Sequence, residues 1–282
     1  MENQIFKKHR SINIKGELFF FDRPEIMGIL NITGDSFYDG GKYNDKDRAL
    51  KRVEEMLDDG AGFIDIGAQS SRPGAREKGA DEELKLLLPV LDAVISSFPD
   101  AVISVDTWHS KVAKEAVNHG AAMINDISGG TFDAQMFDTI AALGVPYVLM
   151  HTGGRPDVMQ DNPVYDDVLN DVISFLSERL NELNLKGVSD VIIDPGFGFG
   201  KTLEHNYTLM KNLDHFAFTE RPVLVGISRK SMIYKLLNIQ PQEALTGTIA
   251  LNTFALLKGA DILRVHDVKA AAETIKIVES LM

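Results

Sequence analysis

The feature that most constrains the fold of this chain is a repeated unit. A short apolar run ends in polar or glycine residues and is followed by a stretch with helical periodicity, such as 47–60, 81–98 or 165–183. Eight such units without a low-complexity linker predict one domain over residues 1–282, folded as a closed (β/α)8 TIM barrel. A doubly wound open sheet, which uses fewer of the same units, is the alternative. The eight runs end at Asn31, Gly67, Asp106, Asp126, His151, Asp194, Ser228 and Asp267.

The residues before the first unit predict a β-hairpin over 11–21, with its turn at Lys15 and Gly16. They lack an apolar core of the length found in a signal peptide, and no segment approaches the roughly 20 apolar residues of a membrane span. The chain has 29 Lys and Arg against 41 Asp and Glu, a net charge of −12, and no cysteine. We therefore expect a cytoplasmic protein that binds small molecules rather than nucleic acid or membranes.

The glycine-rich segment 191–202, VIIDPGFGFGKT, resembles a nucleotide-binding loop at first sight. The Walker A pattern needs glycine where this chain has Pro195, and proline lacks the N–H that would hold a phosphate. The strict alternation of Gly196, Gly198 and Gly200 also differs from the Rossmann spacing. The segment instead predicts a close backbone approach to a ligand that Asp194 binds at the end of a strand.

Other polar side chains end neighbouring predicted strands. Asp106 closes one strand, and Asn125 points to the opposite face from Asp126 because side chains alternate along a strand. With Asp194, they predict two carboxylates and a carboxamide at one barrel mouth. A buried carboxylate can accept two parallel N–H bonds, so this set favours a flat amino-pyrimidine ligand.

Cationic side chains gather at the same predicted strand ends, despite the acidic total. They are Arg72, Arg229, Lys230, Arg264 and His266. Phosphate sites after the last two strands recur in barrels, so the cluster predicts an anion at the mouth. The Gly- and Ser-rich segments 30–41 and 65–75 predict loops after the first two strands, over the ligand.

Seven segments, in order, resemble the signature segments of one family, the dihydropteroate synthases of the pterin-binding barrels. They are 27–41, 65–75, 103–108, 124–130, 192–206, 225–231 and 264–268. The resemblance implies that 6-hydroxymethyl-7,8-dihydropterin pyrophosphate and 4-aminobenzoate are joined to 7,8-dihydropteroate with release of pyrophosphate. It also implies Mg2+, a homodimer, and breakage of the C–O bond to pyrophosphate before the amine attacks.

The resemblance further implies four groups of site residues. The pterin would be held by Asp106, Asn125, Asp194 and Lys230. The pyrophosphate would be held by Asn31, Arg264, His266, Ser71 and Arg72, with Asn31 acting through the metal. The 4-aminobenzoate would contact Phe37, Pro73, Phe199, Lys230 and Ser231. Catalysis would depend on Asp106, Arg264, Asp39 and Arg72.

Three residues depart from the usual pattern of this family: Gly34 stands where proline is common, Gln69 where glutamate is common, and Ser71 where threonine is common. They keep open a non-catalytic pterin-binding paralogue as one alternative. A pterin-binding methyltransferase is the other, although it should not need the Ser-Arg-Pro-Gly segment at 71–74 or the Ser-Arg-Lys-Ser segment at 228–231.

Overall fold

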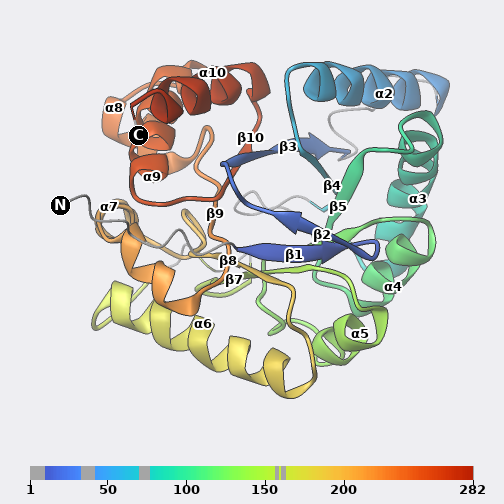
Figure 1. Cartoon of the computed structure of the whole chain (residues 1–282), viewed down its shortest axis with the longest axis horizontal. Helices are drawn as coiled ribbons and strands as arrows, with labels where there is room; N and C mark the ends of the chain where they lie inside the picture. Colours follow the sequence, from blue (N-terminus) through green and yellow to red (C-terminus); the bar gives the residue numbers. More distant parts are fainter. Residues whose placement is uncertain (1–9, 33–41, 70–76, 156–158, 160–162, 282) are drawn as a thin grey trace.

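The computed structural model describes residues 10–32, 42–69, 77–155, 159 and 163–281. Eight parallel strands, in the order β8-β7-β6-β5-β4-β3-β10-β9, form one sheet surrounded by helices (Figure 1). A parallel bridge between Ile193 and Val223 joins β8 to the residue before β9, so the two edges of the sheet meet. The predicted TIM barrel is confirmed. Its strands are β3 (Glu25–Asn31), β4 (Phe63–Gly67), β5 (Val102–Asp106), β6 (Met123–Asp126), β7 (Tyr147–Met150), β8 (Val191–Asp194), β9 (Leu224–Val225) and β10 (Ile262–Val265).

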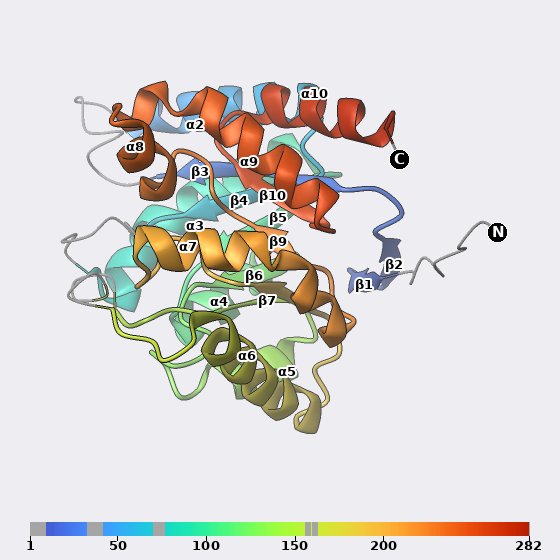
Figure 2. The same ribbon diagram turned by 90° about the vertical axis from the view of Figure 1, so that its left-hand side faces the viewer.

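The helices follow the strands and cover the outside of the barrel (Figures 1 and 2). Polar side chains start two of them: Asp167 accepts the N–H groups of Leu169 and Asn170, and Thr202 forms a capping box with His205. The α-helices are α2 (Lys42–Asp58), α3 (Ala80–Ser97), α4 (Ser110–Asn118), α5 (Met136–Leu143), α6 (Val168–Leu185), α7 (Leu203–Lys211), α8 (Ser231–Leu237), α9 (Leu245–Leu257) and α10 (Val268–Glu279). Two 3-10 helices, η1 (Leu213–Thr219) and η2 (Pro241–Glu243), lie between them.

The predicted hairpin is also confirmed, as β1 (Ser11–Ile14) and β2 (Glu17–Phe20). Its turn residues Lys15 and Gly16 both have positive φ, 53° and 92°, which is the backbone that a two-residue hairpin turn requires. The hairpin covers the end of the barrel where the strands begin, seen on the right in Figure 2. Ile12 and Ile14 pack there against apolar side chains of the strands, and this layer closes the bottom of the barrel.

The structure differs from the sequence prediction in the seventh unit. The apolar run that ends at Ser228 forms only the two residues of β9, because the chain then turns and the amide of Lys230 donates to the carbonyl of Ile227. Two helices, α8 and α9, follow this strand instead of one. Within the described residues, no helix is both long and apolar enough to span a bilayer.

Candidate active site

The inside of the barrel changes from apolar to polar along the strands. Side chains alternate, so every second residue of a strand points inward. On β4 the apolar Phe63 is followed two residues later by Asp65, and on β10 Ile262 is followed by Arg264. The carboxyl ends of barrel strands are where barrel active sites lie, so this polar layer is the candidate site.

Arg264 is the centre of the polar layer. Its Nε donates to Oδ2 of Asp65 at 2.7 Å, and its Nη2 donates to Oδ2 of Asp106 at 2.8 Å. Asn125 donates its Nδ2–H to the same Asp65 oxygen at 2.9 Å. The side chain of Asp65 is fully buried and that of Arg264 is only 16% exposed, so these charge-assisted bonds form largely away from water. One planar cation therefore joins carboxylates from β4 and β5.

The buried carboxyl groups are poorly solvated. Burial raises the pKa of Asp106 to about 7, although the Arg264 charge acts in the opposite direction. Burial likewise raises the pKa of Asp194, which ends β8 and accepts the amide N–H of Gly196 at 2.7 Å. Oδ1 of Asp65 has no hydrogen-bond partner among the described residues. Donor groups of a ligand would satisfy these oxygens, because an unpaired buried acceptor is costly.

Lys230 brings a second cation to the site. Its Nζ donates to the carbonyl of Phe197 at 2.6 Å and lies 4.5 Å from the centre of the Phe199 ring. Burial lowers the pKa of Lys230 to about 8, an effect that the Asp194 carboxylate opposes. Ser231 follows at the first position of α8. Lys230 thus lies between the carboxylate layer and the aromatic ring of Phe199.

The alternating glycines allow the chain after β8 to pass close to its neighbours. Gly196, Gly198 and Gly200 all have positive φ, which L side chains rarely adopt. A Cβ at Gly196 would lie 1.8 Å from the carbonyl oxygen of His151, and one at Gly200 would lie 2.6 Å from Cα of Gly153. The sequence predicts a close backbone approach to a ligand, whereas the approach observed here is between protein segments, so the ligand contact stays a prediction.

Lys201 is buried beneath this turn, where its ammonium group bonds protein atoms. It is 3% exposed, and its Nζ donates to the carbonyls of Gly196 and Phe199 at 2.8 and 3.0 Å. It also lies 2.9 Å from Nδ1 of His151. Burial lowers the pKa of Lys201 to about 7. The lysine fixes the shape of the segment that connects Asp194 to Phe199.

The residues that were predicted to bind an anion lie at the end of the polar layer. His266 comes directly after β10, and its Nδ1 lies 3.1 Å from Oγ of Ser228. Burial and the Arg264 charge lower the pKa of His266 to about 4, so the imidazole is neutral at pH 7. Arg229 instead forms a bidentate ion pair with Asp267, at 3.0 Å for its Nε. Asn31 ends β3 and is exposed.

An apolar group lies next to the carboxylates. Phe199 packs with Trp108, Ile127, Met150 and Met159 in a buried cluster that is separate from the two larger ones. Its members follow or end the strands β5, β6, β7 and β8, with Met159 further along the chain after β7. The cluster gives the site a flat, apolar side next to its polar floor, which suits an aromatic ligand.

The structure brings together most of the predicted site residues that it describes. Arg264 directly contacts Asp106, Lys230 contacts Phe199, and Asn125 joins Arg264 through Asp65. Asn31 and Asp194 end their strands, His266 directly follows β10, and Ser231 is the first residue of α8. Five predicted residues lie outside the described residues: Phe37, Asp39, Ser71, Arg72 and Pro73.

The sequence prediction missed Asp65 and assigned no role to Lys201. Asp65 stands two residues before the end of its strand, and the alternation that placed Asn125 inside the barrel would have placed it there too. The burial of Lys201 could not be predicted either, because nothing in the sequence shows that its side chain is enclosed. The described residues contain no cluster of three or more His, Asp or Glu side chains that could hold a metal.

Known proteins resemble this chain over nearly its whole length. The family described as pterin binding enzyme matches residues 27–266. The dihydropteroate synthase of Escherichia coli K12 is 42% identical over 270 residues, which cover 95% of both chains. The corresponding protein of Haemophilus influenzae is 45% identical over 256 residues, or 90% of this chain and 92% of the relative.

Solved structures agree with this assignment. The dihydropteroate synthase of Yersinia pestis in complex with a sulfonamide drug superposes with a TM-score of 0.90 at 42% identity, over 96% of this chain and 98% of that one. The enzyme of Xanthomonas albilineans with 4-aminobenzoic acid gives a TM-score of 0.90 at 36% identity, over 97% and 98%. Fold, site and sequence therefore lead to one conclusion: the chain belongs to the dihydropteroate synthase family of pterin-binding enzymes.

Proposed function

We propose that this chain condenses 6-hydroxymethyl-7,8-dihydropterin pyrophosphate with 4-aminobenzoate to give 7,8-dihydropteroate and pyrophosphate. The observation that carries the proposal is the position of Arg264 inside the barrel mouth, where it is bonded to the fully buried Asp65 and to the partly buried Asp106. The carboxylates of the polar layer can accept hydrogen bonds from a heterocycle with several N–H donors. The Arg264 cation beside these carboxylates can bind a ligand whose other end is anionic.

The pterin ring would lie on the polar layer, held by Asp106, Asn125, Asp194 and Lys230. Asp194 would accept from the amino-pyrimidinone edge with Oδ2, the carboxylate oxygen that does not accept from the amide of Gly196. Lys230 would donate to a ring acceptor. The buried Oδ1 of Asp65 offers a further acceptor, and we include this residue in the proposed pterin site.

The pyrophosphate would be bound by Asn31, Arg264 and His266, with Ser71 and Arg72 completing the set. A neutral His266 can donate one N–H to an oxygen anion while its other nitrogen bonds Ser228. Mg2+ prefers oxygen ligands and commonly shares them with substrate phosphates. Asn31 offers a carboxamide oxygen, Oδ1, for such a role. A Cβ built at Gly67 would lie 3.7 Å from this oxygen and 3.3 Å from Cβ of Asp106, so Asn31 lies beside the carboxylate layer.

The 4-aminobenzoate would bind on the apolar side, against Phe199, with its carboxylate near Lys230 and Ser231. Phe37 and Pro73 would contact its ring from the loops. This arrangement places the amine toward the CH2–O carbon of the pterin. Its nitrogen would attack that carbon and then lose a proton.

The chemistry requires charge stabilisation more than a nucleophilic side chain. When the C–O bond breaks, its electron pair goes to the pyrophosphate, and Arg264 with Arg72 would stabilise the growing negative charge. Asp106 and Asp39 would stabilise the cation that remains on the pterin. Mg2+ would neutralise part of the leaving-group charge when it is bound.

Several outer helices expose apolar side chains, which supports a homodimer. On α8, α9 and α10 the side chains of Leu236, Leu257 and Ile277 are 55%, 58% and 64% exposed. Exposed apolar side chains on neighbouring helices are typical of an interface where they form a continuous patch. We propose that two copies of the chain associate through these helices in the cytoplasm. Light scattering after gel filtration would give twice the monomer mass.

Replacement of Asp194 by Asn tests the proposed pterin site. The amide has the size of the carboxylate but presents a donor where the pterin edge also donates, so pterin affinity should fall by roughly two orders of magnitude. Isothermal titration with the pterin substrate measures this loss. Asp214→Asn, an exposed carboxylate change on η1, serves as the control. Wild-type affinity in Asp194→Asn would contradict the proposal.

A further inference from the structure

Ser228 and His266 continue the pairing of two strands beyond the point where one of them ends. In the parallel ladder, Leu224 of β9 faces Ile262 of β10, 38 positions later. Ser228 and His266 are separated by the same 38 positions, and their side chains are bonded although β9 has already ended. A side-chain contact therefore keeps the two turns in register where backbone pairing has stopped.

The Ser228 hydroxyl bonds His266 twice. Its Oγ accepts the backbone N–H of His266 at 3.2 Å and lies 3.1 Å from the ring nitrogen Nδ1. Ser228 is 4% exposed, and its hydroxyl has no other hydrogen-bond partner among the described residues. A serine hydroxyl has one proton to donate and two lone pairs that can accept.

These bonds determine which ring nitrogen carries the proton. Because burial lowers the pKa of His266 to about 4, the ring at pH 7 has one N–H group and one acceptor nitrogen. If Nδ1 carried the proton, Ser228 would accept twice and its buried O–H would have no acceptor in the described part of the chain, which is costly. If Nδ1 is the acceptor, the O–H donates to it and both residues are satisfied. The contact therefore favours the tautomer with its proton on Nε2.

Nε2 is the ring nitrogen that remains for a ligand. It bonds no group among the described residues, and it is not one of their enclosed, unpaired polar atoms, which include Oδ1 of Asp65. Burial, Arg264 and Lys230 all act to keep the ring neutral. The ring can therefore present a neutral N–H donor beside two cations, and an anionic oxygen is a strong acceptor for such a group.

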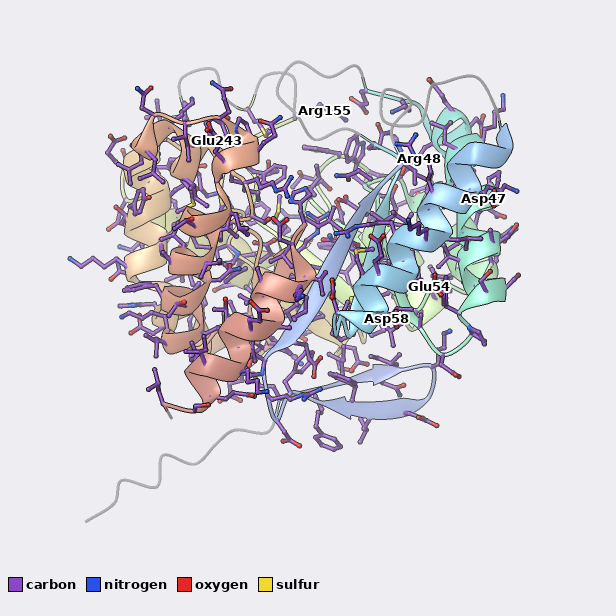
Figure 3. All side chains as sticks on the ribbon, turned by 90° about the horizontal axis from the view of Figure 1, so that it is seen from above. Asp47, Arg48, Glu54, Asp58, Arg155 and Glu243 are labelled. Carbon is purple, nitrogen blue, oxygen red and sulfur yellow. The ribbon has the colours of Figure 1, made fainter. Side chains whose placement is uncertain are left out.

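The main chain of His266 is held as well as its ring. Its carbonyl accepts from Nη2 of Arg52 on α2 at 2.6 Å. Arg48, one helical turn earlier on α2, lies at the end of the barrel opposite the hairpin (Figure 3). The next residue in the chain, Asp267, forms the bidentate ion pair with Arg229. The backbone N–H, the carbonyl and Nδ1 of His266 are thus all bonded, which leaves the ring little freedom to turn.

We propose that Ser228 is a positioning residue that holds His266 with its proton on Nε2, so that the imidazole donates a hydrogen bond to an oxygen of the leaving pyrophosphate. The proton stays on the ring throughout. Ser228 acts through His266 and itself contacts no substrate. This inference rests on the proposed function, because it requires that His266 binds the pyrophosphate.

Nitrogen NMR of the histidine rings tests the tautomer without catalysis. In protein labelled with nitrogen-15 histidine at pH 7, we expect Nε2 of His266 to carry the proton and Nδ1 to lack it. His266→Gln removes these two signals and so identifies them among those of the seven histidines. In Ser228→Ala the Nδ1 signal should shift because this nitrogen loses its donor, and the other tautomer should become populated. A proton on Nδ1 in the wild type would overturn the proposal, whatever the variants do.

Binding of the leaving group is the second test, measured by isothermal titration. Ser228→Ala should raise Kd for inorganic pyrophosphate by roughly 10-fold, the size of one hydrogen bond to a charged group. Kd for 6-hydroxymethyl-7,8-dihydropterin, which lacks the pyrophosphate, should change by less than about threefold. Ser177→Ala, which removes a hydroxyl bonded to the carbonyl of Ile173 on α6, is the control and should change neither constant.

A double-variant cycle shows whether Ser228 acts through His266. His266→Gln supplies an amide N–H donor that has no tautomers. Addition of Ser228→Ala to this variant should therefore weaken pyrophosphate binding by less than about twofold, whereas the same change in the wild type costs roughly 10-fold. A serine that acted only through a general loss of structure would have equal effects in both backgrounds.

Failure of the inference can be distinguished from failure of the proposed function. Unchanged pyrophosphate affinity in Ser228→Ala, or an equal effect of this change in both backgrounds, would overturn the positioning role of Ser228. If His266→Leu also leaves pyrophosphate affinity unchanged, the assignment of His266 to the anion site has failed. A wild-type protein that forms no dihydropteroate would contradict the proposed reaction, whereas the tautomer of His266 is measured without turnover.

Discussion

Replacement of Arg264 by Met should destabilise the protein strongly at pH 8. The guanidinium makes two charge-assisted bonds, at 2.7 Å to Asp65 and 2.8 Å to Asp106, and those carboxylates are 0% and 14% exposed. Removal of one partner of a buried ion pair costs about 3–5 kcal/mol, because the remaining charge is left without compensation. A domain with a total stability of roughly 5–15 kcal/mol would lose a large part of it.

The size of the loss should depend on pH. The pKa of Asp106 is already raised to about 7 by burial, and removal of the arginine charge raises it further. Below that pKa the carboxyl group can take up a proton instead of remaining as an uncompensated charge. The variant should therefore lose less stability at pH 5 than at pH 8.

Urea unfolding followed by circular dichroism, at both pH values, measures these differences. Lys258→Met, which removes an ion pair with side chains 30% and 52% exposed, is the control and should cost less than about 1 kcal/mol. Turnover of Arg264→Met, measured on the folded protein, should fall by roughly 10²-fold or more. If Arg264→Met lost no more stability at pH 8 than the control, the reasoning about the buried ion pair would be wrong.

Two further predictions concern buried titratable groups. The folded-state pKa of Asp106, about 7, lies above its ordinary value of 3.8, so its contribution is largest at acid pH and is lost as pH rises through 7. Between pH 5 and pH 8 the free energy of unfolding of the wild type should therefore fall by about 2–3 kcal/mol more than that of Asp106→Asn. Equal pH dependence of the two free energies would contradict this. Lys201→Met should cost about 2–4 kcal/mol, since it leaves the carbonyls of Gly196 and Phe199 and Nδ1 of His151 without their donor. Because the pKa of Lys201 is lowered from 10.5 to about 7, this loss of stability should be larger at pH 9 than at pH 6. Calorimetric melting of both proteins at the two pH values measures the loss, and a larger loss at pH 6 would contradict the prediction.

The sequence predicted the architecture well where a local rule operates. Lys15 and Gly16 gave the hairpin turn, and seven of the eight apolar runs became strands of four to seven residues. The run before Ser228 was the exception. Its strand stops after Val225, and the chain then turns, with the amide of Lys230 donating to the carbonyl of Ile227.

The sequence was less informative about which polar side chains are paired. His119 follows α4, and its contact with Asp92, 2.7 Å from Nδ1 to Oδ1, depends on the packing of α3 beside α4. Lys201 and Arg229 show the same limit. Both belong to motifs that suggest a ligand, yet both side chains bond protein groups. These partners could not be predicted, because only the fold brings them close.

The most direct test of the proposed reaction is a coupled assay with the purified protein, 6-hydroxymethyl-7,8-dihydropterin pyrophosphate, 4-aminobenzoate and Mg2+. Dihydropteroate and released pyrophosphate would be followed together. We predict that both form in a 1:1 ratio and that omission of either substrate abolishes dihydropteroate formation. A protein that binds the pterin but forms neither product would contradict the proposed function and favour a non-catalytic pterin-binding paralogue.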